Sequence, residues 1–446
     1  MSSPVPTENS AKENAYAVFR NADFFRYLIA RFIASFGMQM LVVAVDWELY
    51  ERTNSALALG FVGLALMVPM FLGTLPSGHV ADTYNRKKII LVTTFILALA
   101  SLALAGVSKF TPNTPASVPR FQMFMYALLV LIGATRTFLW PASAAYVASI
   151  VPREQLSRAV TFNSGAFQLS SVLGPAMAGL LIWFTHGAWI IYALNGLAGL
   201  ICFALVLSIR HEHKVPPREP VTFRSLITGF QFVFHNKIIL GTITLDMFAV
   251  LLGGAVSLLP IFAKDILASG PNGLGLLRAA MPIGAVICTV IIAHRAPIQK
   301  AGRAMLLCVA IFGVATILFG LVNQQCLGKY FSAPNAVWFW LAFGLLALSG
   351  AVDNVSVIIR QTLVQILTPD DKRGRVSAVN SLFIGTSNEL GGFESGFTAQ
   401  LFGPMMAHSI ATGTILSTVV GGFGTVAVVM AVAWIWPQVR RYGKLS

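Results

Sequence analysis

The sequence predicts an all-α membrane protein with twelve transmembrane helices in two pseudo-symmetric six-helix bundles. The first observation is composition: 56% of the 446 residues are hydrophobic and 11% are charged, whereas soluble domains are roughly 25% charged. The second is the length of the apolar runs, and the third is a set of matching residues in the two halves. These observations exclude a soluble enzyme, a disordered chain, and a β-barrel, whose strands alternate over about 10 residues.

Each predicted span is an apolar run of roughly 20 residues or more that is bounded by charge, proline or glycine. The first six runs cover 24–50, 56–78, 88–108, 121–150, 159–185 and 188–209. The second six cover 238–263, 273–294, 304–322, 337–367, 376–402 and 411–436. The two bundles are therefore expected at 24–209 and 238–436. Polar segments complete the organisation as an N-terminal tail (1–23), a linker (210–237) and a C-terminal tail (437–446).

The lysines and arginines predict how the chain is oriented. If both termini are cytoplasmic, 22 of the 31 Lys and Arg residues lie in inside segments, five lie outside and four lie within helices. Cytoplasmic loops carry an excess of Lys and Arg, so this distribution predicts cytoplasmic termini. The net charge of +14 then follows from topology, and we expect no nucleic-acid partner because the charges do not gather on one solvated face.

The two halves share residues at one constant spacing, which we call the repeat offset. It is the spacing at which Pro152, Glu154 and Arg158 align with Pro369, Asp371 and Arg375. Farther along, the pairs at this offset are Asn163 and Asn380, Ser164 and Ser381, Gly174 and Gly391, and Gly179 and Gly396. Parallel six-helix repeats are a transporter architecture whose substrate site lies between the halves near the midplane. The alternative explanation is loop chemistry common to any polytopic protein.

The segment between the second and third predicted helices carries the clearest motif. It resembles the cytoplasmic signature of the major facilitator superfamily, roughly G-x-x-x-D-R-x-G-R-[RK], and the matching positions are Gly78, Asp82, Arg86 and Lys87. We expect the glycine to allow close helix packing, the aspartate to face a cation or a helix N-terminus, and the two basic residues to hold the loop inside. Thr83 replaces the usual first Arg, which removes a possible salt bridge. Asn85 replaces Gly, a mild change because Asn tolerates the left-handed conformation.

Other stretches are similar to one branch of that superfamily, the drug and metabolite exporters that include the enterobactin exporter. They are 21–26, 47–51, 59–63, 258–260 and 373–377. The fifth predicted helix carries Gly174, Pro175 and Gly179, which resemble the G-P-x-x-[AG]-G signature of antiporters. Packing of small residues between membrane helices explains the same pattern equally well. The resemblance covers the whole chain after the N-terminal tail, and it implies the major facilitator fold and secondary active transport across the inner (plasma) membrane.

Charged residues inside the predicted spans are the candidate site, because each costs about 2.5–3.5 kcal/mol near the bilayer centre on insertion scales. The candidates for substrate or proton binding are Asp46, Arg136, Asp246, Asp353, Arg360 and Glu389. In the fold that the resemblance implies, helices 1, 4, 7 and 10 line a central cavity, and all four carry charge. Helices 3, 6, 9 and 12, which lie outermost in that fold, carry none within the apolar run.

Two spacings among these charges predict how they pair. Arg136 and Asp353 are equivalent at the repeat offset, so we expect them to face each other between the bundles. Asp353 and Arg360 are seven residues apart and share one helix face. We expect the aspartates to bind protons or recognise cations, with the two arginines as counter-charges, because a buried carboxylate near a mobile arginine changes protonation with conformation. Static interhelical ion pairs are the alternative, above all for Arg278 near an outer helix end.

The predicted function is therefore proton-coupled efflux of a small, partly hydrophobic molecule such as a drug, siderophore or metabolite. Nutrient uptake or facilitated diffusion of a polar solute, and flipping of lysophospholipid or lipid, stay open as alternatives. We expect no enzymatic activity, cofactor or metal, because no nucleotide-binding or hydrolase pattern is present and the four cysteines form no CxxC. The expected partners are the substrate, protons and membrane lipid, and the chain is expected to be a monomer.

Overall fold

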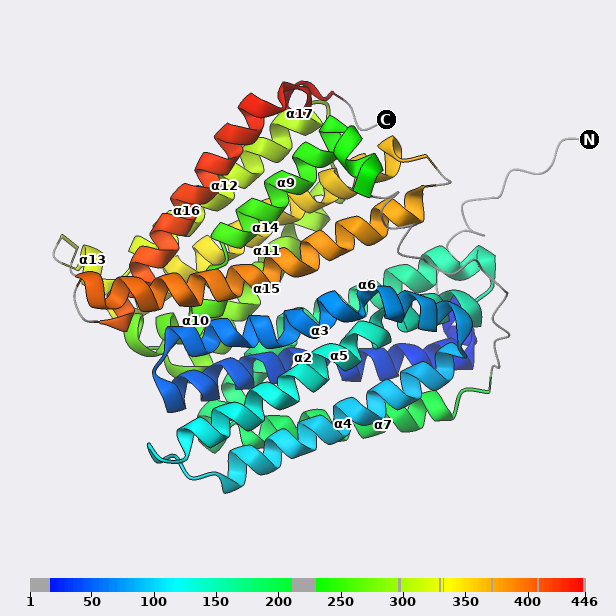
Figure 1. Cartoon of the computed structure of the whole chain (residues 1–446), viewed down its shortest axis with the longest axis horizontal. Helices are drawn as coiled ribbons and strands as arrows, with labels where there is room; N and C mark the ends of the chain where they lie inside the picture. Colours follow the sequence, from blue (N-terminus) through cyan, green and yellow to red (C-terminus); the bar gives the residue numbers. More distant parts are fainter. Residues whose placement is uncertain are drawn as a thin grey trace, which may run out of the picture.

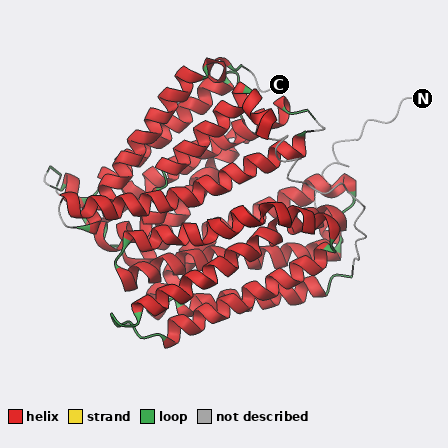
Figure 2. Cartoon of the chain, in the orientation of Figure 1, coloured by secondary structure: helices red, strands yellow, loops and turns green. Residues whose placement is uncertain are grey.

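The structure is a computed structural model that describes residues 17–210, 230–295, 298–328, 330–331, 333–369, 372–406 and 409–443. Within these ranges every regular element is a helix (Figure 2). This confirms the predicted all-α fold class. Most of the predicted linker, at 211–229, and parts of both tails, at 1–16 and 444–446, lie outside the described residues.

The long helices of the first half begin and end close to the predicted runs. They are α2 (Ala22–Thr53), α3 (Ala56–Thr83), α4 (Arg86–Phe110), α5 (Val118–Ile150), α6 (Leu156–Thr185) and α7 (Trp189–Leu207). Those of the second half are α9 (Lys237–Leu252), α11 (Gly270–Ala293), α12 (Ala301–Leu321), α14 (Asn335–Leu367), α15 (Arg373–Met406) and α16 (Ile410–Ile435). Short helices join or flank them, namely η1 (Ala17–Arg20), η2 (Arg153–Gln155), α13 (Gln324–Leu327) and α17 (Pro437–Arg441).

Eleven helical segments of the described chain are long and apolar enough to cross a membrane. The exception among the twelve predicted spans is α15. Its 34 residues would extend about 51 Å at 1.5 Å per residue, well beyond a hydrocarbon core of about 30 Å. Polar side chains such as Asn388, Glu389 and Glu394 lower its hydropathy. The least apolar of the long helices is therefore one that carries a candidate site residue.

Polar residues between the apolar runs fix where the helices begin. Only Asn54 and Ser55 separate α2 from α3, and Asn54 turns the chain with a φ of 46°, which Asn tolerates. The Ser55 hydroxyl then accepts a hydrogen bond of 3.3 Å from the Ala58 N–H. Asn21 and Asn236 cap α2 and α9 by accepting from two backbone N–H groups each. Such caps satisfy donors that the first helical turn leaves free.

The repeat offset also relates the helix boundaries of the two halves. α14 begins and ends at the positions equivalent to the first and last residues of α5, and α15 begins at the position equivalent to the start of α6. Equivalent helices also have equivalent neighbours, because α4 packs on α7 as α12 packs on α16, and α2 packs on α6 as α9 packs on α15. In Figure 1 the ribbons of α2–α7 and those of the second half lie closest near α10 and diverge towards α17 and the start of α2. We call these groups the first and second helix sets.

The seventh predicted helix, at 238–263, is not continuous. α9 ends at Leu252, and after Gly253 and Gly254 the chain continues as η3 (Ala255–Leu258), α10 (Leu259–Ile261) and the π-helix η4 (Phe262–Ile266). At the break, a Cβ on Gly254 would lie 3.1 Å from the carbonyl carbon of Gly391 in α15. The glycines therefore allow two backbones to approach closely, which the unbroken apolar pattern did not reveal.

Two pairs of glycines bring the helix sets into backbone contact. A Cβ on Gly179 of α6 would lie 2.4 Å from the carbonyl oxygen of Pro271 and 2.9 Å from the Cα of Gly275 in α11. On the other side, a Cβ on Gly396 of α15 would lie 2.8 Å from the nitrogen of Gly60 in α3. Gly179 and Gly396 are themselves equivalent at the repeat offset. We call these two contacts the glycine seams.

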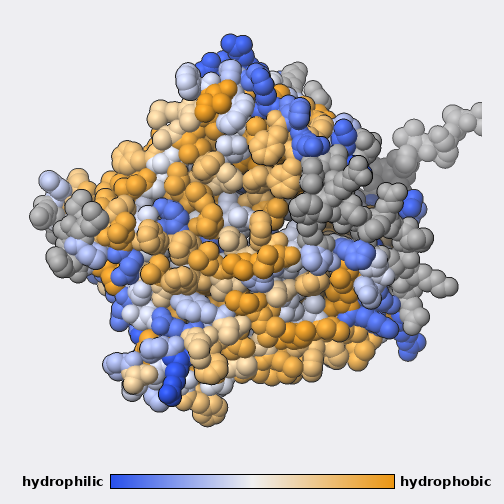
Figure 3. Space-filling view, in the orientation of Figure 1, coloured by the Kyte–Doolittle hydropathy of each residue, from blue (hydrophilic) through white to orange (hydrophobic). Residues whose placement is uncertain are grey.

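The face of the molecule in Figure 3 is largely apolar across the middle of the helices. Large side chains stay exposed there and elsewhere, for example Trp434 at 83%, Phe184 at 75% and Leu72 at 70%. A soluble monomer rarely exposes apolar patches of this extent. This apolar surface is therefore expected to contact lipid tails in a membrane.

Substitution of Gly179 by alanine tests the seam between α6 and α11. Overpacking of this kind costs about 1–3 kcal/mol, so we expect Gly179→Ala to lower the free energy of unfolding in detergent by that amount. Gly165→Ala in the same helix is the control, because a Cβ there meets nothing within 4 Å. It should raise stability by about 0.5–1 kcal/mol through helix propensity. Equal effects of the two substitutions would contradict a tight seam.

Candidate functional site

An ion pair joins the two helix sets within the spanning region. A guanidinium nitrogen of Arg278 in α11 donates to the carboxylate of Asp46 in α2. Only 14% of the Arg278 side chain and 7% of the Asp46 side chain are exposed. A buried charge without a partner is strongly unfavourable in a membrane helix. Each residue therefore supplies the counter-charge that the other needs, and it does so from the opposite set.

Glu389 of α15 and Arg136 of α5 bring two further charges to the same region. Electrostatic interactions link Glu389 to Arg136, Asp46 and Arg278. Asp46 and Arg136 also line one small cavity of about 20 Å³. The backbone of Glu389 lies against α3, because a Cβ on Gly63 would be 2.4 Å from the Glu389 carbonyl oxygen. Asp46, Arg136, Arg278 and Glu389 form what we call the charge cluster, in which each set contributes one acid and one arginine.

Polar contacts close the interface at one end of the charge cluster. The Tyr50 hydroxyl of α2 donates to the carboxylate of Asp265 in the π-helix. The neighbouring Lys264 donates to Asn54 Oδ1 at 3.0 Å. These side chains lie at the turn after α2 and at the distorted end of the seventh helix. The two sets are therefore in direct polar contact at the end of the molecule that carries this turn.

Arg360 and Asp246 form a second buried ion pair, which stays within one helix set. Arg360 of α14 contacts the carboxylate of Asp246 in α9, and 3% and 11% of their side chains are exposed. Asp353, two turns away on α14, is half-buried. It makes no ion pair or hydrogen bond with any residue that the structure describes. Arg360 therefore pairs with Asp246 of α9 and not with Asp353 of its own helix.

The expected pairing of Arg136 with Asp353 is not found among the described residues. Arg136 instead interacts with Glu389. Residues at the repeat offset occupy equivalent places in the two repeats, but symmetry equivalence does not require that they touch. No ion pair joins Arg136 and Asp353 in the described part of the chain, and the ion pair that crosses between the sets joins unlike positions, Asp46 and Arg278.

The basic residues of the motif at 78–87 hold the turn between α3 and α4 in place. Arg86 is 6% exposed, and its Nε donates to the Ala81 carbonyl at 3.2 Å. Lys87 Nζ donates to the carbonyls of Leu207 and Ile209, at 3.2 and 2.6 Å. These carbonyls lie at the C-terminal end of α7, where a cation is favoured by the helix dipole. The motif thus ties three helices of the first set together.

Two expectations for the same motif need correction. A Cβ on Gly78 would meet nothing within 4 Å, so this glycine is not required for close packing in this conformation. Asn85 has a φ of −63° and caps α4 by accepting from the Lys88 N–H, so it does not adopt a left-handed conformation. Asp82 lies in the last turns of α3, and its side chain is outside what the structure describes.

The glycines and proline of the fifth predicted helix are packing positions. A Cβ on Gly174 would lie 2.6 Å from the Cβ of Gln39 in α2. The Pro175 carbonyl oxygen lies where a Cβ on Gly275 would be only 2.4 Å away, and Gly179 forms the adjacent glycine seam. The pattern therefore serves close helix packing. Because the seam crosses between the sets, that packing also sets how closely the sets approach.

Arg278 is a site residue that the sequence pattern did not predict. It lies near an outer helix end by hydropathy alone, and the pattern gave no partner for it. The spacing from Gly275 to Arg278 is the signal that could have found it, because residues three apart lie on one helix face. A charge one turn from a seam glycine is placed to reach the opposite helix set.

Metal-binding groups are not found within the described residues, where no three His, Cys, Asp or Glu side chains gather. The four cysteines carry free thiols. The acids of the charge cluster each have arginine neighbours, an arrangement that suits an anion or a proton better than a cation. The chemistry available at the cluster is therefore ion pairing and proton exchange.

Two repeated helix sets that meet at an interface with buried charges are an architecture of secondary transporters. Residues 27–392 match the profile of the Major Facilitator Superfamily. The chain belongs to this superfamily and is a multi-pass membrane transporter.

Known relatives support the same assignment. The chain is 26% identical over 417 residues to the enterobactin exporter EntS of Shigella flexneri, covering 93% of this chain and 92% of that protein. It is 25% identical over 415 residues to the same exporter of Escherichia coli O1:K1, with the same coverage. Among solved structures, a D-xylose-proton symporter has a TM-score of 0.70 at 13% identity, covering 93% of this chain and 97% of that one. A bacterial homologue of the human lysosomal transporter Spinster, in an inward-facing conformation, has a TM-score of 0.69 at 12% identity, with 95% and 98% covered.

A double-mutant cycle tests the ion pair between Asp46 and Arg278. Breaking a buried pair costs about 3–5 kcal/mol, so Asp46→Asn alone should strongly lower the free energy of unfolding in detergent. Asp46→Asn combined with Arg278→Met should cost less than the sum of the single changes, because the orphaned charge is removed. The more exposed pair of Asp23 and Arg26, whose side chains are 25% and 44% exposed, is the control, with a coupling of about 1 kcal/mol or less. Simple additivity at Asp46 and Arg278 would contradict the pairing.

Proposed function

We propose that the protein exports a small, partly hydrophobic molecule across the inner membrane and that protons moving inward drive the export. The observation that carries this proposal is the charge cluster, in which Asp46 and Arg278 form an ion pair between the two helix sets and Glu389 interacts electrostatically with Arg136. Where buried charges link two helix sets, the balance between the closed and the separated arrangement of the sets depends on whether those charges are ionised. Export, as opposed to uptake, is supported by the relatives named as enterobactin exporters, which match along nearly the whole chain.

We further propose that the structure is closed towards the outside and open towards the cytoplasm. The cross-set contacts at Asp46, Tyr50, Lys264 and the glycine seams lie in the half near the turn at 54–55. That turn is on the outer side if both termini are cytoplasmic, as the distribution of Lys and Arg favours. The two moving bodies would be residues 24–209 and 238–436, joined by the linker at 210–237. A single chain then contains both bodies, so a monomer suffices.

Coupling would follow from the separation of the charge cluster. In the present state each carboxylate interacts with an arginine of the opposite set, Asp46 with Arg278 and Glu389 with Arg136. When the outer side opens, Asp46 and Glu389 move away from the arginines of the opposite set, and each can take up a proton from outside. Closure brings the arginines back and releases those protons towards the open cytoplasmic side. One inward proton movement is thus tied to one cycle of the two halves.

Substrate would drive the opposite movement. A molecule that enters from the cytoplasmic side meets Arg136 and Glu389, both half-buried, and competes with their interaction. Loss of that interaction weakens the outer closure and favours the outward-open state by population shift. A partly hydrophobic molecule with polar groups fits this requirement, because the small cavity beside Asp46 and Arg136 has an otherwise apolar lining.

Transport into everted membrane vesicles tests the function directly. Enterobactin is the first probe, because the relatives are named for it. We expect it to accumulate in vesicles containing the protein when their lumen is acidic, and not in vesicles without the protein. Collapse of the proton gradient should abolish accumulation. Equal uptake with and without the gradient would instead show passive facilitation and overturn proton coupling, and absence of enterobactin transport would exclude it as the substrate.

Neutralising Glu389 should separate coupling from transport. We expect Glu389→Gln to lose gradient-driven accumulation and to keep exchange of labelled for unlabelled probe at equal pH, because exchange needs no net proton movement. Glu394→Gln is the matched control on the same helix. Its carboxylate forms no ion pair with any described residue, although it contacts the Ser395 hydroxyl, and this change should leave both activities intact. Full gradient-driven accumulation by Glu389→Gln would contradict the assignment of Glu389.

Reporter fusions test the proposed orientation. A green fluorescent protein fused after Ser446 should fluoresce, because it folds in the cytoplasm. Alkaline phosphatase fused at the same point should be inactive, whereas the same enzyme inserted in the turn at 111–117 should be active. The opposite pattern would place the closed end of the structure on the cytoplasmic side and reverse the proposed conformation.

A further inference from the structure

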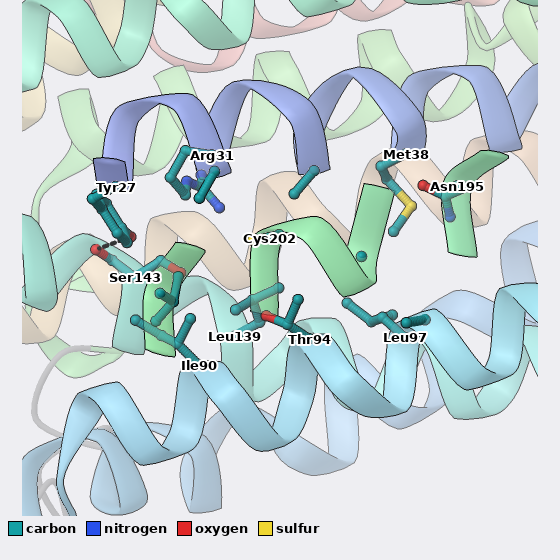
Figure 4. A pocket seen from close by; sticks show the side chains of 15 residues that line it. Tyr27, Arg31, Met38, Ile90, Thr94, Leu97, Leu139, Ser143, Asn195 and Cys202 are labelled. Carbon is teal, nitrogen blue, oxygen red and sulfur yellow. Dashed lines mark hydrogen bonds between the residues drawn. The ribbon is translucent and has the colours of Figure 1, made fainter. Parts of the chain in front are cut away.

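A second small cavity lies inside the first helix set, enclosed by α2, α4, α5 and α7 (Figure 4). Its volume is about 30 Å³, and none of the four charge-cluster residues lines it. Its polar lining consists of Tyr27, Arg31, Thr94, Ser143, Asn195 and Cys202. In Figure 4, Arg31 projects from α2 into the space that Thr94 and Leu97 face from α4. The cavity therefore combines one cation with several hydroxyl groups.

Arg31 has no counter-charge in this setting. Among the residues that the structure describes it forms no ion pair and no hydrogen bond. The acid nearest to it along α2, Asp23, pairs with Arg26 instead. A guanidinium keeps its charge at any physiological pH, and a charge within the membrane needs a partner or water. Arg31 is half-buried, and the position can therefore accept a negative group or water, because no described acid pairs with it.

The hydroxyl groups around the cavity can complete such a site. Ser143 is 3% exposed, and its Oγ lies beside the Tyr27 hydroxyl and makes no hydrogen bond with the described residues that meets the usual distance and angle. Thr94 is also 3% exposed and lies beside the Cys202 thiol. The Tyr27 hydroxyl is already committed, since it donates to the Ser143 carbonyl at 3.1 Å. An unpaired buried hydroxyl is unfavourable. A ligand that accepts a hydrogen bond from Ser143 and faces Arg31 would supply both the missing hydrogen bond and the missing counter-charge.

The size of the cavity restricts what can occupy it. A space of about 30 Å³ holds no more than one or two particles the size of a water molecule. Phosphate, sulfate and the carboxylate of a larger substrate do not fit. We propose that this cavity binds one small monovalent anion of halide size, held by the Arg31 guanidinium and the Ser143 and Thr94 hydroxyls. The anion would neutralise Arg31 and link α2, α4 and α5, independently of the transported substrate.

Chloride binding to the purified full-length protein tests this proposal. The protein is prepared in detergent with sodium gluconate, whose anion is too large for the cavity, and chloride replaces gluconate at constant ionic strength. We expect a saturable rise in the unfolding midpoint, because a ligand that binds only the folded state stabilises it. Equilibrium dialysis with radioactive chloride should give one bound ion per chain, displaced by bromide. An anomalous scattering peak from bromide beside Arg31 would place it.

Matched variants separate this site from general salt effects. Arg31→Gln should lose bound chloride and the shift in midpoint, whereas Arg26→Gln, in the same helix but exposed, should keep both. Ser143→Ala tests the site if Arg31→Gln does not fold, and it should weaken chloride binding with no change in the one-to-one limit. Chloride binding that persists in Arg31→Gln, or no response in the unsubstituted protein, would overturn the proposal and leave water as the occupant.

Discussion

The close approach of two backbones at the glycine seams is the constraint on which the rest of the structure depends. Lipid tails are as apolar as the helices, so burial of apolar surface does not press helices together in a membrane. Close packing and polar contacts must do so instead. Gly179 against Gly275, and Gly396 against Gly60, bring the sets near enough for side chains to reach across. Asp46 and Arg278 can meet only because α2, α6 and α11 are already in contact.

The charges that interact across the interface in turn make the contact between the two sets reversible. Glycine contacts alone would hold the sets together in one state with no means of release. Charges that pair across the interface are favourable only while the sets are close, and each becomes costly when its partner leaves. Protonation of an acid removes the acid's share of that cost, whereas the arginine keeps its charge and must be hydrated or paired again. The interface can therefore have two stable arrangements, one with paired charges and one with neutralised acids, and this bistability is what alternating access requires.

Much of the fold was predictable from the sequence, because hydropathy and capping are local properties. The apolar runs, the turns at 54–55 and 84–85 and the repeat boundaries need no knowledge of distant contacts. The partners of the charges do need it. Arg360 pairs with Asp246 and Arg136 interacts with Glu389, choices that depend on helix rotation and on which helices of the two sets meet. The helix was not predicted to end at Leu252, although Gly253 and Gly254 stand at the break, because the close approach of the Gly391 backbone is a contact with a distant part of the chain.

The two repeats share their helix boundaries and seam glycines, but they differ in where their charged residues lie. The seam glycines Gly179 and Gly396 are equivalent at the repeat offset. The charges are not repeated in this way, because the residues equivalent to Asp46, Arg278 and Glu389 are Ala263, Phe61 and Val172. Duplication thus accounts for two halves that close on each other in the same way at both seams. The polar chemistry arose at unlike positions within that shared frame. A symmetric closure with an asymmetric charge lining can move as two equal bodies and still present different groups to a substrate on each side.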